Sequence, residues 1–219
     1  MPNIRAVVFD LDGLMFNTED IFNHAGREQL KRRGKEMTDE LLSRMMGRRA
    51  GEAFAIMIEM HELSESADEL QAECKEIFYG LLDAHLAPMP GLFELLACIE
   101  LHELPTGVAT SSNRKYLDNI LARFELTHRF QITFASEDVR HGKPHPEIYL
   151  KAAEHFGIAP AEMLVLEDSE AGSRAAAAAG AHVVSVPHEH SRSHDFSVSN
   201  YVVESLHDPY VLDLIGGTI

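Results

Sequence analysis

The chain of 219 residues has few features that would place it in a membrane, on nucleic acid or outside the cell. No apolar run approaches the roughly 20 residues that a membrane-spanning helix needs, and the N-terminus lacks a charged region followed by an apolar core, so no signal peptide is expected. Basic residues are scarce: 19 Lys and Arg stand against 35 Asp and Glu, for a net charge of −16. Because nucleic acid and anionic membranes bind basic patches, neither is expected as a partner.

Cysteine is also scarce. The chain contains only Cys74 and Cys98, and each falls inside a helical pattern of apolar residues. Two isolated thiols form neither a disulfide framework nor a zinc-ligand spacing. This indicates a reduced protein with a cytoplasmic location.

The first motif is an apolar strand that runs into two acids. Residues Ala6–Phe9 carry no charge and are followed by Asp10, Asp12 and Gly13. An uninterrupted apolar run is typical of a central strand in a parallel sheet, whose carboxyl end is where ligands bind. Residues two apart in extended chain point the same way, so both carboxylates can address one ligand. The alternative is an ordinary turn, because Asp and Gly are common turn residues.

Residues 17–87 differ in character from the rest of the chain. Apolar residues recur at intervals of three and four among many charges, which predicts about four amphipathic helices. Ser66 and Thr38 precede acidic first turns and are expected helix starts. Since a connection of about 70 residues far exceeds a normal βα loop, the segment is expected to be an inserted helical domain that can close over a site. The predicted domains are 1–16 with 88–219, and 17–87.

After the breaker at Ala87–Gly91, strands alternate with helices, which predicts βαβ units. The expected fold is α/β, a three-layer Rossmann-like parallel sheet with an inserted all-α cap after the first strand. Expected strands after the first are 106–109, 131–134, 163–166, 182–186 and, more weakly signalled, 201–203. Expected helices are 92–102, 113–124, 145–156, 170–179 and 207–214.

Polar residues follow several of these strands. Thr110 and Ser111 come directly before an expected helix, whose N-terminus is suited to an anion; the alternative is a simple helix cap. Lys143 lies between Gly142 and Pro144 and is a candidate phosphate binder, with a solvated surface lysine as the alternative.

Glu167 and Asp168 follow the strand at 163–166. If they lie beside Asp10 and Asp12, the carboxylates repel one another unless a cation binds between them. Hard oxygen ligands favour Mg²⁺. The alternative is acidic capping of the Ala-rich helix that follows. By contrast, His188, His190 and His194 lie in a Ser-rich stretch and are expected in a polar loop rather than in a transition-metal site.

Taken in chain order, the segments FDLDG, TSSN, GKPHPEIY and LEDSEAG resemble the haloacid dehalogenase superfamily over essentially the whole chain. They look most like the subgroup that contains β-phosphoglucomutase and sugar-phosphate phosphatases. The helical insertion resembles the cap domain of that subgroup. The resemblance implies an enzyme, a phosphoric monoester hydrolase that depends on Mg²⁺ and acts on a small phosphorylated metabolite, such as a sugar phosphate.

The resemblance also implies roles for individual residues. Asp10 is expected to be the nucleophile that forms an aspartyl-phosphate, and Asp12 the general acid and base. Both are expected to contribute to the metal site, Asp12 through its backbone carbonyl. Asp168 is expected to complete that site, with Glu167 in its outer shell. The phosphoryl group is expected to be held by Thr110, Ser111 and Lys143.

Two alternatives to a phosphatase remain. The first is a β-phosphoglucomutase-type mutase, but Phe22 stands where those enzymes carry a His, which favours hydrolysis. Asn17 is a second departure from the family pattern, since many members carry Asp at this position. The second is a non-catalytic sugar-phosphate binder; such a protein is expected to lack Asp10 or Asp12.

In the cap, Arg48 and Arg49 lie in a Gly-flanked loop and are candidate substrate contacts, with solvated arginines as the alternative. A monomer or weak homodimer is expected.

Overall fold

The computed structural model describes residues 2–45 and 50–216. The chain divides into two compact units. One is formed by Met1–Phe16 and Pro88–Ile219, and the other by Asn17–Ala87. Each unit is described by itself below.

The first unit is built on a six-stranded sheet in the order β3-β2-β1-β4-β5-β6. Its strands, all paired in parallel, are β1 (Ala6–Phe9), β2 (Thr106–Ala109), β3 (Ile132–Phe134), β4 (Met163–Glu167), β5 (His182–Ser185) and β6 (Tyr201–Val202). The chain first adds strands on one side of β1 and then returns to add β4 on the other side. This reversal puts a topological switch point between the carboxyl ends of β1 and β4, where α/β sheets bind ligands.

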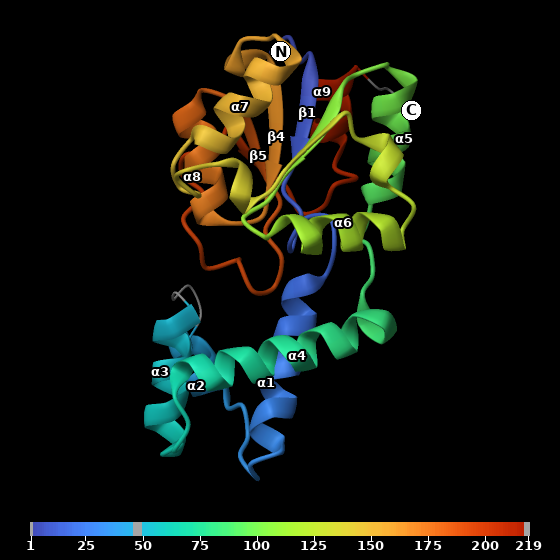
Figure 1. Ribbon diagram of the computed structural model, residues 1–219. Helices are drawn as coiled ribbons and strands as arrows, with labels where there is room; N and C mark the ends of the chain where they lie inside the picture. Colours follow the sequence, from blue (N-terminus) through green and yellow to red (C-terminus); the bar gives the residue numbers. More distant parts are fainter. Residues whose placement is uncertain (1, 46–49, 217–219) are drawn as a thin grey trace. The chain divides into compact units, whose positions relative to one another are not determined.

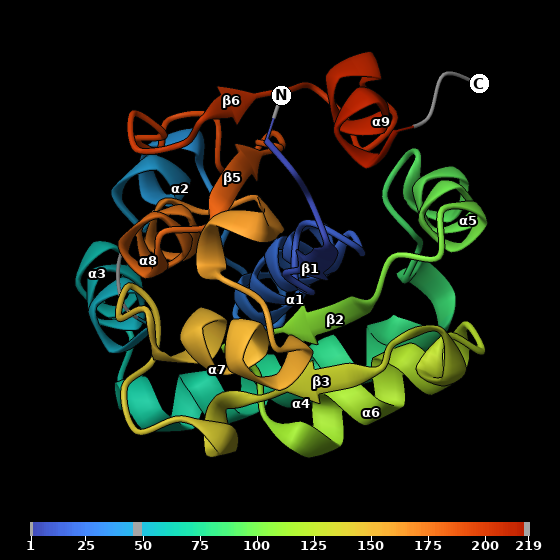
Figure 2. The same ribbon diagram turned by 90° about the horizontal axis from the view of Figure 1, so that it is seen from above.

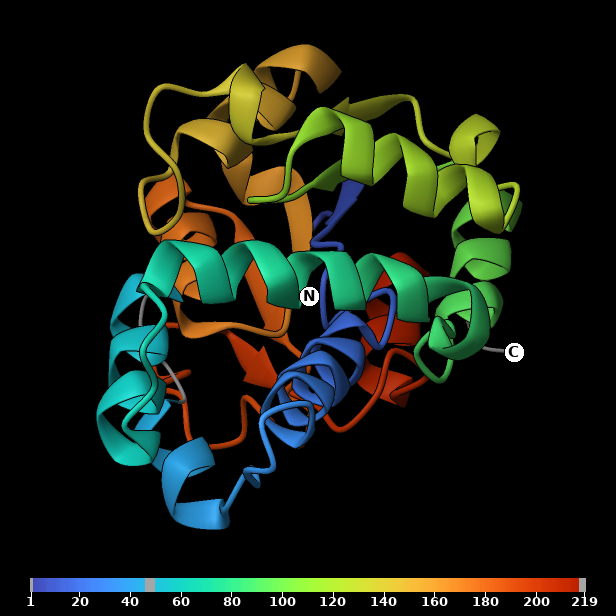
Figure 3. The same cartoon turned by 60° about the horizontal axis from the view of Figure 1, so that its bottom comes forward.

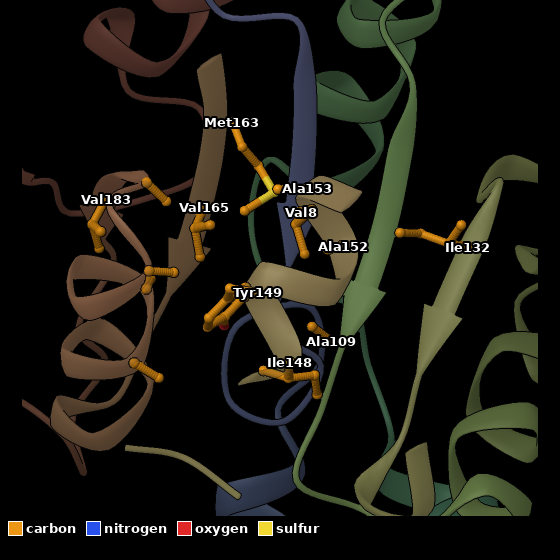
Figure 4. Packing of buried hydrophobic residues seen from close by; sticks show 14 residues of the cluster. Val8, Ala109, Ile132, Ile148, Tyr149, Ala152, Ala153, Met163, Val165 and Val183 are labelled. Carbon is orange, nitrogen blue, oxygen red and sulfur yellow. The ribbon is translucent and has the colours of Figure 1, made fainter. Parts of the chain in front are cut away.

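Helices cover both faces of this sheet (Figures 1 and 2). Figure 2 shows α7 (Glu147–Phe156) and α8 (Glu170–Ala179) on one face, and α5 (Leu92–Leu101) and α9 (Pro209–Ile215) on the other. The helix α6 (Arg114–Arg123) connects β2 to β3. In Figure 4, strand residues Val8, Val165 and Val183 pack with the α7 ring of Tyr149 in the buried core. Burial of this apolar layer provides the main stabilisation of the unit and fixes the strand ends relative to one another.

The second unit is helical: α1 (Thr18–Lys31), α2 (Asp39–Met45), α3 (Ala50–His61) and α4 (Ala67–His85). The long helix α4 packs across α1 (Figure 3). Ser66 begins α4 with a capping box, in which its hydroxyl accepts from the Glu69 N–H and the Glu69 carboxylate accepts from the Ser66 N–H. Asn17 joins the two ends of the unit, because its side chain donates to the His85 carbonyl at 3.2 Å and accepts from the Ala87 N–H at 2.8 Å.

The predicted fold class is confirmed: a Rossmann-like parallel sheet between helical layers, with an all-helical insertion after the first strand. Differences are confined to element ends. The helix expected from residue 145 begins at Glu147, directly after Pro146, and the last helix begins at Pro209 behind an Asp208 cap instead of at residue 207. Within the described ranges, no helix is both long and apolar enough to cross a bilayer.

Candidate functional site

Asp10 and Asp12 follow β1 at the switch point. The Asp10 N–H donates to the carbonyl of Leu166 in the neighbouring strand β4 at 3.0 Å, which continues the sheet ladder into the site. Asp10 is buried, whereas Asp12 is half-buried. Gly13 turns the chain with φ of +80°, and a Cβ at this position would overlap the carboxylate of Asp168. Glycine is therefore required both by the backbone conformation and by the close approach of the β4 end.

Lys143 lies in the irregular segment before α7. Its ammonium contacts Asp10 Oδ1 and Glu167 Oε1, each at 2.5 Å, and donates to the Ala109 carbonyl at 2.9 Å. The side chain is only 5% exposed, so the alternative of a solvated surface lysine is excluded. The segment is held by the carboxylate of Glu147, which accepts two of its backbone N–H groups at 2.9 and 3.0 Å. The lysine thus reaches three strand ends at once.

Burial controls the electrostatics of this group. It raises the pKa of Asp10 well above its usual value; Lys143 opposes the rise, and the carboxylates of Glu167, Asp168 and Asp12 add to it. Burial alone would lower the pKa of Lys143, but the neighbouring Asp10 and Glu167 more than offset this and hold the pKa well above its usual value. Lys143 therefore keeps its positive charge, whereas full ionisation of the several acids that share this site is opposed by burial and by their mutual repulsion.

Three buried carboxylates lie close enough together to hold a metal ion. Asp10, Glu167 and Asp168 each offer an oxygen, and these oxygens lie within 4.8 Å of one another. If all three acids are ionised, Lys143 balances only one of them, and the remaining buried negative charge is costly unless a further cation compensates it. An all-oxygen donor set that remains under-compensated fits Mg²⁺.

Glu167 is held by donors that the motif pattern did not reveal. It is fully buried, and its Oε1 accepts from the Tyr149 hydroxyl at 2.6 Å as well as from Lys143. Its Oε2 accepts from the Ser169 hydroxyl at 3.1 Å. The ring of Tyr149 also lies under the Lys143 ammonium, 5.1 Å from it. The helix α7 therefore positions both charges of this ion pair.

Asp12 accepts three hydroxyl hydrogen bonds. Thr110 and Ser112 donate to Oδ2 at 3.2 and 2.7 Å, and Tyr116 donates to Oδ1 at 2.8 Å. Of the two predicted hydroxyls, the structure thus brings Thr110 to the acid, whereas the side chain of Ser111 is exposed. Ser112 belongs to the TSSN motif but was given no role from the sequence, and Tyr116 was not singled out. Tyr116 is 104 residues from Asp12, and only the fold brings the two together.

A histidine also contacts the acid cluster. His188, in the irregular segment after β5, places Nε2 2.9 Å from Asp168 Oδ2. The sequence pattern indicated only a polar loop here, and this contact across 20 positions depends on the parallel pairing of β4 with β5. Because outer-shell partners of this kind orient metal ligands, His188 is a candidate support for Asp168. The cap candidates Arg48 and Arg49 lie outside the described residues.

Comparison with known proteins decides the family. A family model described as haloacid dehalogenase-like hydrolase matches residues 7–186, which include Asp10, Asp12, Lys143, Glu167 and Asp168. The chain belongs to this family. The first acid pair, the hydroxyl cluster, the lysine and the second acid pair come, in chain order, at or after the ends of β1, β2, β3 and β4.

Similar members of the haloacid dehalogenase-like family include named phosphatases. The chain is 30% identical over 203 residues to the bifunctional riboflavin kinase/FMN phosphatase of Arabidopsis thaliana, covering 92% of this chain and 53% of that protein. It thus spans about half the length of the Arabidopsis protein. It is 31% identical over 177 residues to the phosphorylated carbohydrates phosphatase of Thermotoga maritima, covering 81% of this chain and 82% of the other.

Among solved structures, a Thermotoga maritima protein with a provisional β-phosphoglucomutase name is similar in fold. It matches with a TM-score of 0.83 and 27% identity, covering 99% of this chain and 100% of that one. A match over nearly the whole of both chains means that the helical insertion is shared as well as the sheet.

Proposed function

We propose that this protein is a Mg²⁺-dependent phosphatase that hydrolyses a small phosphorylated metabolite, such as a sugar phosphate, through an aspartyl-phosphate on Asp10. The observation that carries the proposal is the buried contact of Lys143 with Asp10 and Glu167, beside Asp168, at the switch point of the sheet. The family relationship and the phosphatase names of two relatives support it.

Asp10 is the nucleophile of the proposed reaction. A carboxylate oxygen of Asp10 forms a bond to phosphorus while the bond from phosphorus to the ester oxygen breaks. Asp12 gives a proton to the departing oxygen. In the second half, Asp12 takes a proton from water, the water oxygen bonds to phosphorus, and the acyl-phosphate bond breaks, so that Asp10 is restored and phosphate is released.

Positive charge and donors at the site favour this transfer. Lys143, fixed against Asp10, is placed to reduce the repulsion between the nucleophile and an anionic phosphoryl group. Thr110 and Ser111, before α6, are the proposed donors to the phosphoryl oxygens, where negative charge spreads in the transition state.

Asp10, Asp168 and the backbone carbonyl of Asp12 would hold Mg²⁺, with Glu167 in the outer shell. When bound, the ion supplies charge neutralisation and polarises the phosphoryl group. The burial of three carboxylates around one lysine supports this assignment.

We further propose that residues 17–87 form a cap domain on a core of residues 1–16 and 88–219, and that the cap selects the substrate, with Arg48 and Arg49 as candidate contacts. The division of the chain at these residues supports the boundaries. A cytoplasmic location and a monomer or weak homodimer are also proposed; the free thiols Cys74 and Cys98 support the former.

A phosphosugar mutase is the second candidate, favoured by the similarity to the Thermotoga structure that carries such a name. The position of interest is Phe22, which lies on α1 half-exposed with its ring 6.2 Å from that of Phe78 and offers no proton relay. Incubation with β-glucose 1-phosphate separates the two: the phosphatase releases phosphate, and a mutase forms glucose 6-phosphate.

The proposal is tested by release of phosphate from p-nitrophenyl phosphate and from a panel of phosphorylated metabolites, with Mg²⁺ or with EDTA. Turnover is expected with Mg²⁺ only, and Asp10→Asn is expected to abolish it. The matched control is Asp213→Asn, an exposed acid on α9, which should retain full activity. Absence of turnover on every compound would refute the phosphatase and leave the non-catalytic binder.

A further inference from the structure

The hydroxyl groups around Asp12 are more numerous than the proposed mechanism uses. Both carboxylate oxygens are occupied: Oδ1 by Tyr116 and Oδ2 by Ser112 and Thr110. The proposed function assigns Thr110 to the phosphoryl group and gives no task to the other two.

Thr110 cannot serve both partners at once. A hydroxyl carries one proton, and in this structure Thr110 donates it to Asp12 at 3.2 Å while accepting from the Ser112 N–H at 2.9 Å. When Thr110 donates to a phosphoryl oxygen instead, Asp12 loses that bond. One donor then remains for each carboxylate oxygen, Ser112 on Oδ2 and Tyr116 on Oδ1. These two fix the plane of the carboxyl group at two points.

The phenol of Tyr116 is itself held firmly. Tyr116 is buried in the first turn of α6, and its N–H donates to the side chain of the helix cap, Asn113, at 3.0 Å. The next residue after the cap, Arg114, donates to the hydroxyl and carbonyl of Thr133 at 2.6 and 2.7 Å and pairs with Asp138. The start of α6 is thereby attached to β3 and the segment after it, and this anchored turn carries the buried Tyr116 ring.

We infer that Tyr116, together with Ser112, is a positioning residue that holds the Asp12 carboxyl in line with the leaving-group oxygen while Thr110 binds the phosphoryl group. This inference rests on the proposed function, because it requires Asp12 to be the acid. Loss of one well-placed donor lets the carboxyl rotate, so proton delivery to the leaving group slows while nucleophilic attack by Asp10 is unaffected.

The test uses two esters of similar size that differ in the need for a proton. p-Nitrophenolate is a stable anion and leaves without protonation, whereas the alkoxide released from benzyl phosphate is strongly basic and requires an acid. For Tyr116→Phe, kcat/KM is expected to fall about tenfold with benzyl phosphate, the effect of losing one hydrogen bond that orients the acid. With p-nitrophenyl phosphate it should change less than about twofold.

The rate with p-nitrophenyl phosphate also reports the fraction of folded protein, because misfolding or a general distortion lowers kcat/KM equally for p-nitrophenyl phosphate and benzyl phosphate. Tyr201→Phe is the matched control: this tyrosine is about half-exposed on the edge strand β6, stacked on Tyr210. It should alter neither rate. In an Asp12→Asn background, Tyr116→Phe should cause no additional loss with benzyl phosphate, since the two changes remove one function.

The outcomes separate this inference from the proposed function. An equal loss on both esters, or no loss on either, for Tyr116→Phe would overturn the positioning role while leaving the phosphatase intact, provided that Asp12→Asn impairs benzyl phosphate selectively. If Asp12→Asn shows no such selectivity, Asp12 is not the acid and both proposals fall. No turnover by the wild-type protein would refute the proposed function and this inference with it.

Discussion

At the scale of single residues, Gly172 shows how closely the site is packed. It lies in α8, and a Cβ built on it would overlap the carboxylate of the fully buried Glu167. Glycine in a helix normally weakens it, so the residue is kept here by the approach of Glu167.

Gly172→Ala is expected to displace Glu167 from Lys143, and therefore to lower both stability and phosphatase activity. The expected loss of stability is of the order of 1–3 kcal/mol, as for other overpacked buried sites, measured by urea unfolding. The control is Gly80→Ala in α4, where a Cβ meets nothing within 4 Å. That change should stabilise by about 0.5–1 kcal/mol through helix propensity. A stabilised, fully active Gly172→Ala protein would contradict the packing account.

Cys74 offers a second test at this scale. Burial raises the pKa of its thiol to about 11. Since only the thiolate reacts, about one molecule in a thousand is reactive at pH 8, and the fraction becomes large only as the pH approaches that pKa. Iodoacetamide at pH 8 should therefore label Cys74 slowly in the native protein and rapidly in urea, as followed by peptide mass spectrometry. Equal rates in both states would show that the thiol is neither buried nor perturbed.

The charged residues of the candidate site could be predicted from the sequence, because they follow expected strands and are of types that bind metal or phosphate. Asp10, Lys143, Glu167 and Asp168 could be grouped because parallel strands end at one edge, and the structure brings their charged groups together. The supporting contacts could not be predicted in this way. Whether a helix residue such as Tyr116 reaches the site depends on how its helix is rotated and packed against the sheet. The spacing of apolar residues along the sequence predicts neither.

At the scale of elements, two helix starts of the insertion followed from their expected caps, Thr38 and Ser66. Ser66 precedes an acidic first turn, and in the structure it forms both bonds of a capping box with Glu69. Strand positions followed from short apolar runs, but element ends shifted by one or two residues, because prolines and side-chain caps at residues such as Pro146 and Asp208 decide them.

Ser66→Ala removes this cap and should destabilise the helical unit by about 1 kcal/mol. Labelling of Cys74 in α4 at increasing urea concentration reports the transition of that unit. The control is Ser64→Ala, an exposed serine two positions earlier whose hydroxyl donates to the carboxylate of the adjacent Glu65 at 3.3 Å. If both variants shift the midpoint equally, the capping box contributes nothing specific to α4.

At the scale of the whole molecule, the chain has an excess of acid that is concentrated in part inside the core. The net charge is −16, and three of the acids converge in the buried site with one lysine. Such a protein is expected to bind a cation at this point more readily than any anion, and under the proposed function the metal precedes the phosphate substrate.

Mg²⁺ is therefore expected to stabilise the folded protein, because the three carboxylates converge only in the native state. Thermal denaturation should shift to higher temperature as Mg²⁺ is added and return with EDTA. Asp168→Asn should abolish most of this shift, whereas Asp213→Asn should leave it unchanged. A shift of the same size in Asp168→Asn would place the ion elsewhere.

The most direct test of the central proposal is to locate the phosphoryl group during turnover. The protein is mixed with p-nitrophenyl phosphate and Mg²⁺, quenched in acid within the first turnovers and reduced with borohydride, which converts an acyl-phosphate to an alcohol. Peptide mass spectrometry should then find homoserine in place of Asp10, and no such product without substrate. Phosphate release with Asp10 unmodified, or with the reduced residue at any other position, would contradict the account.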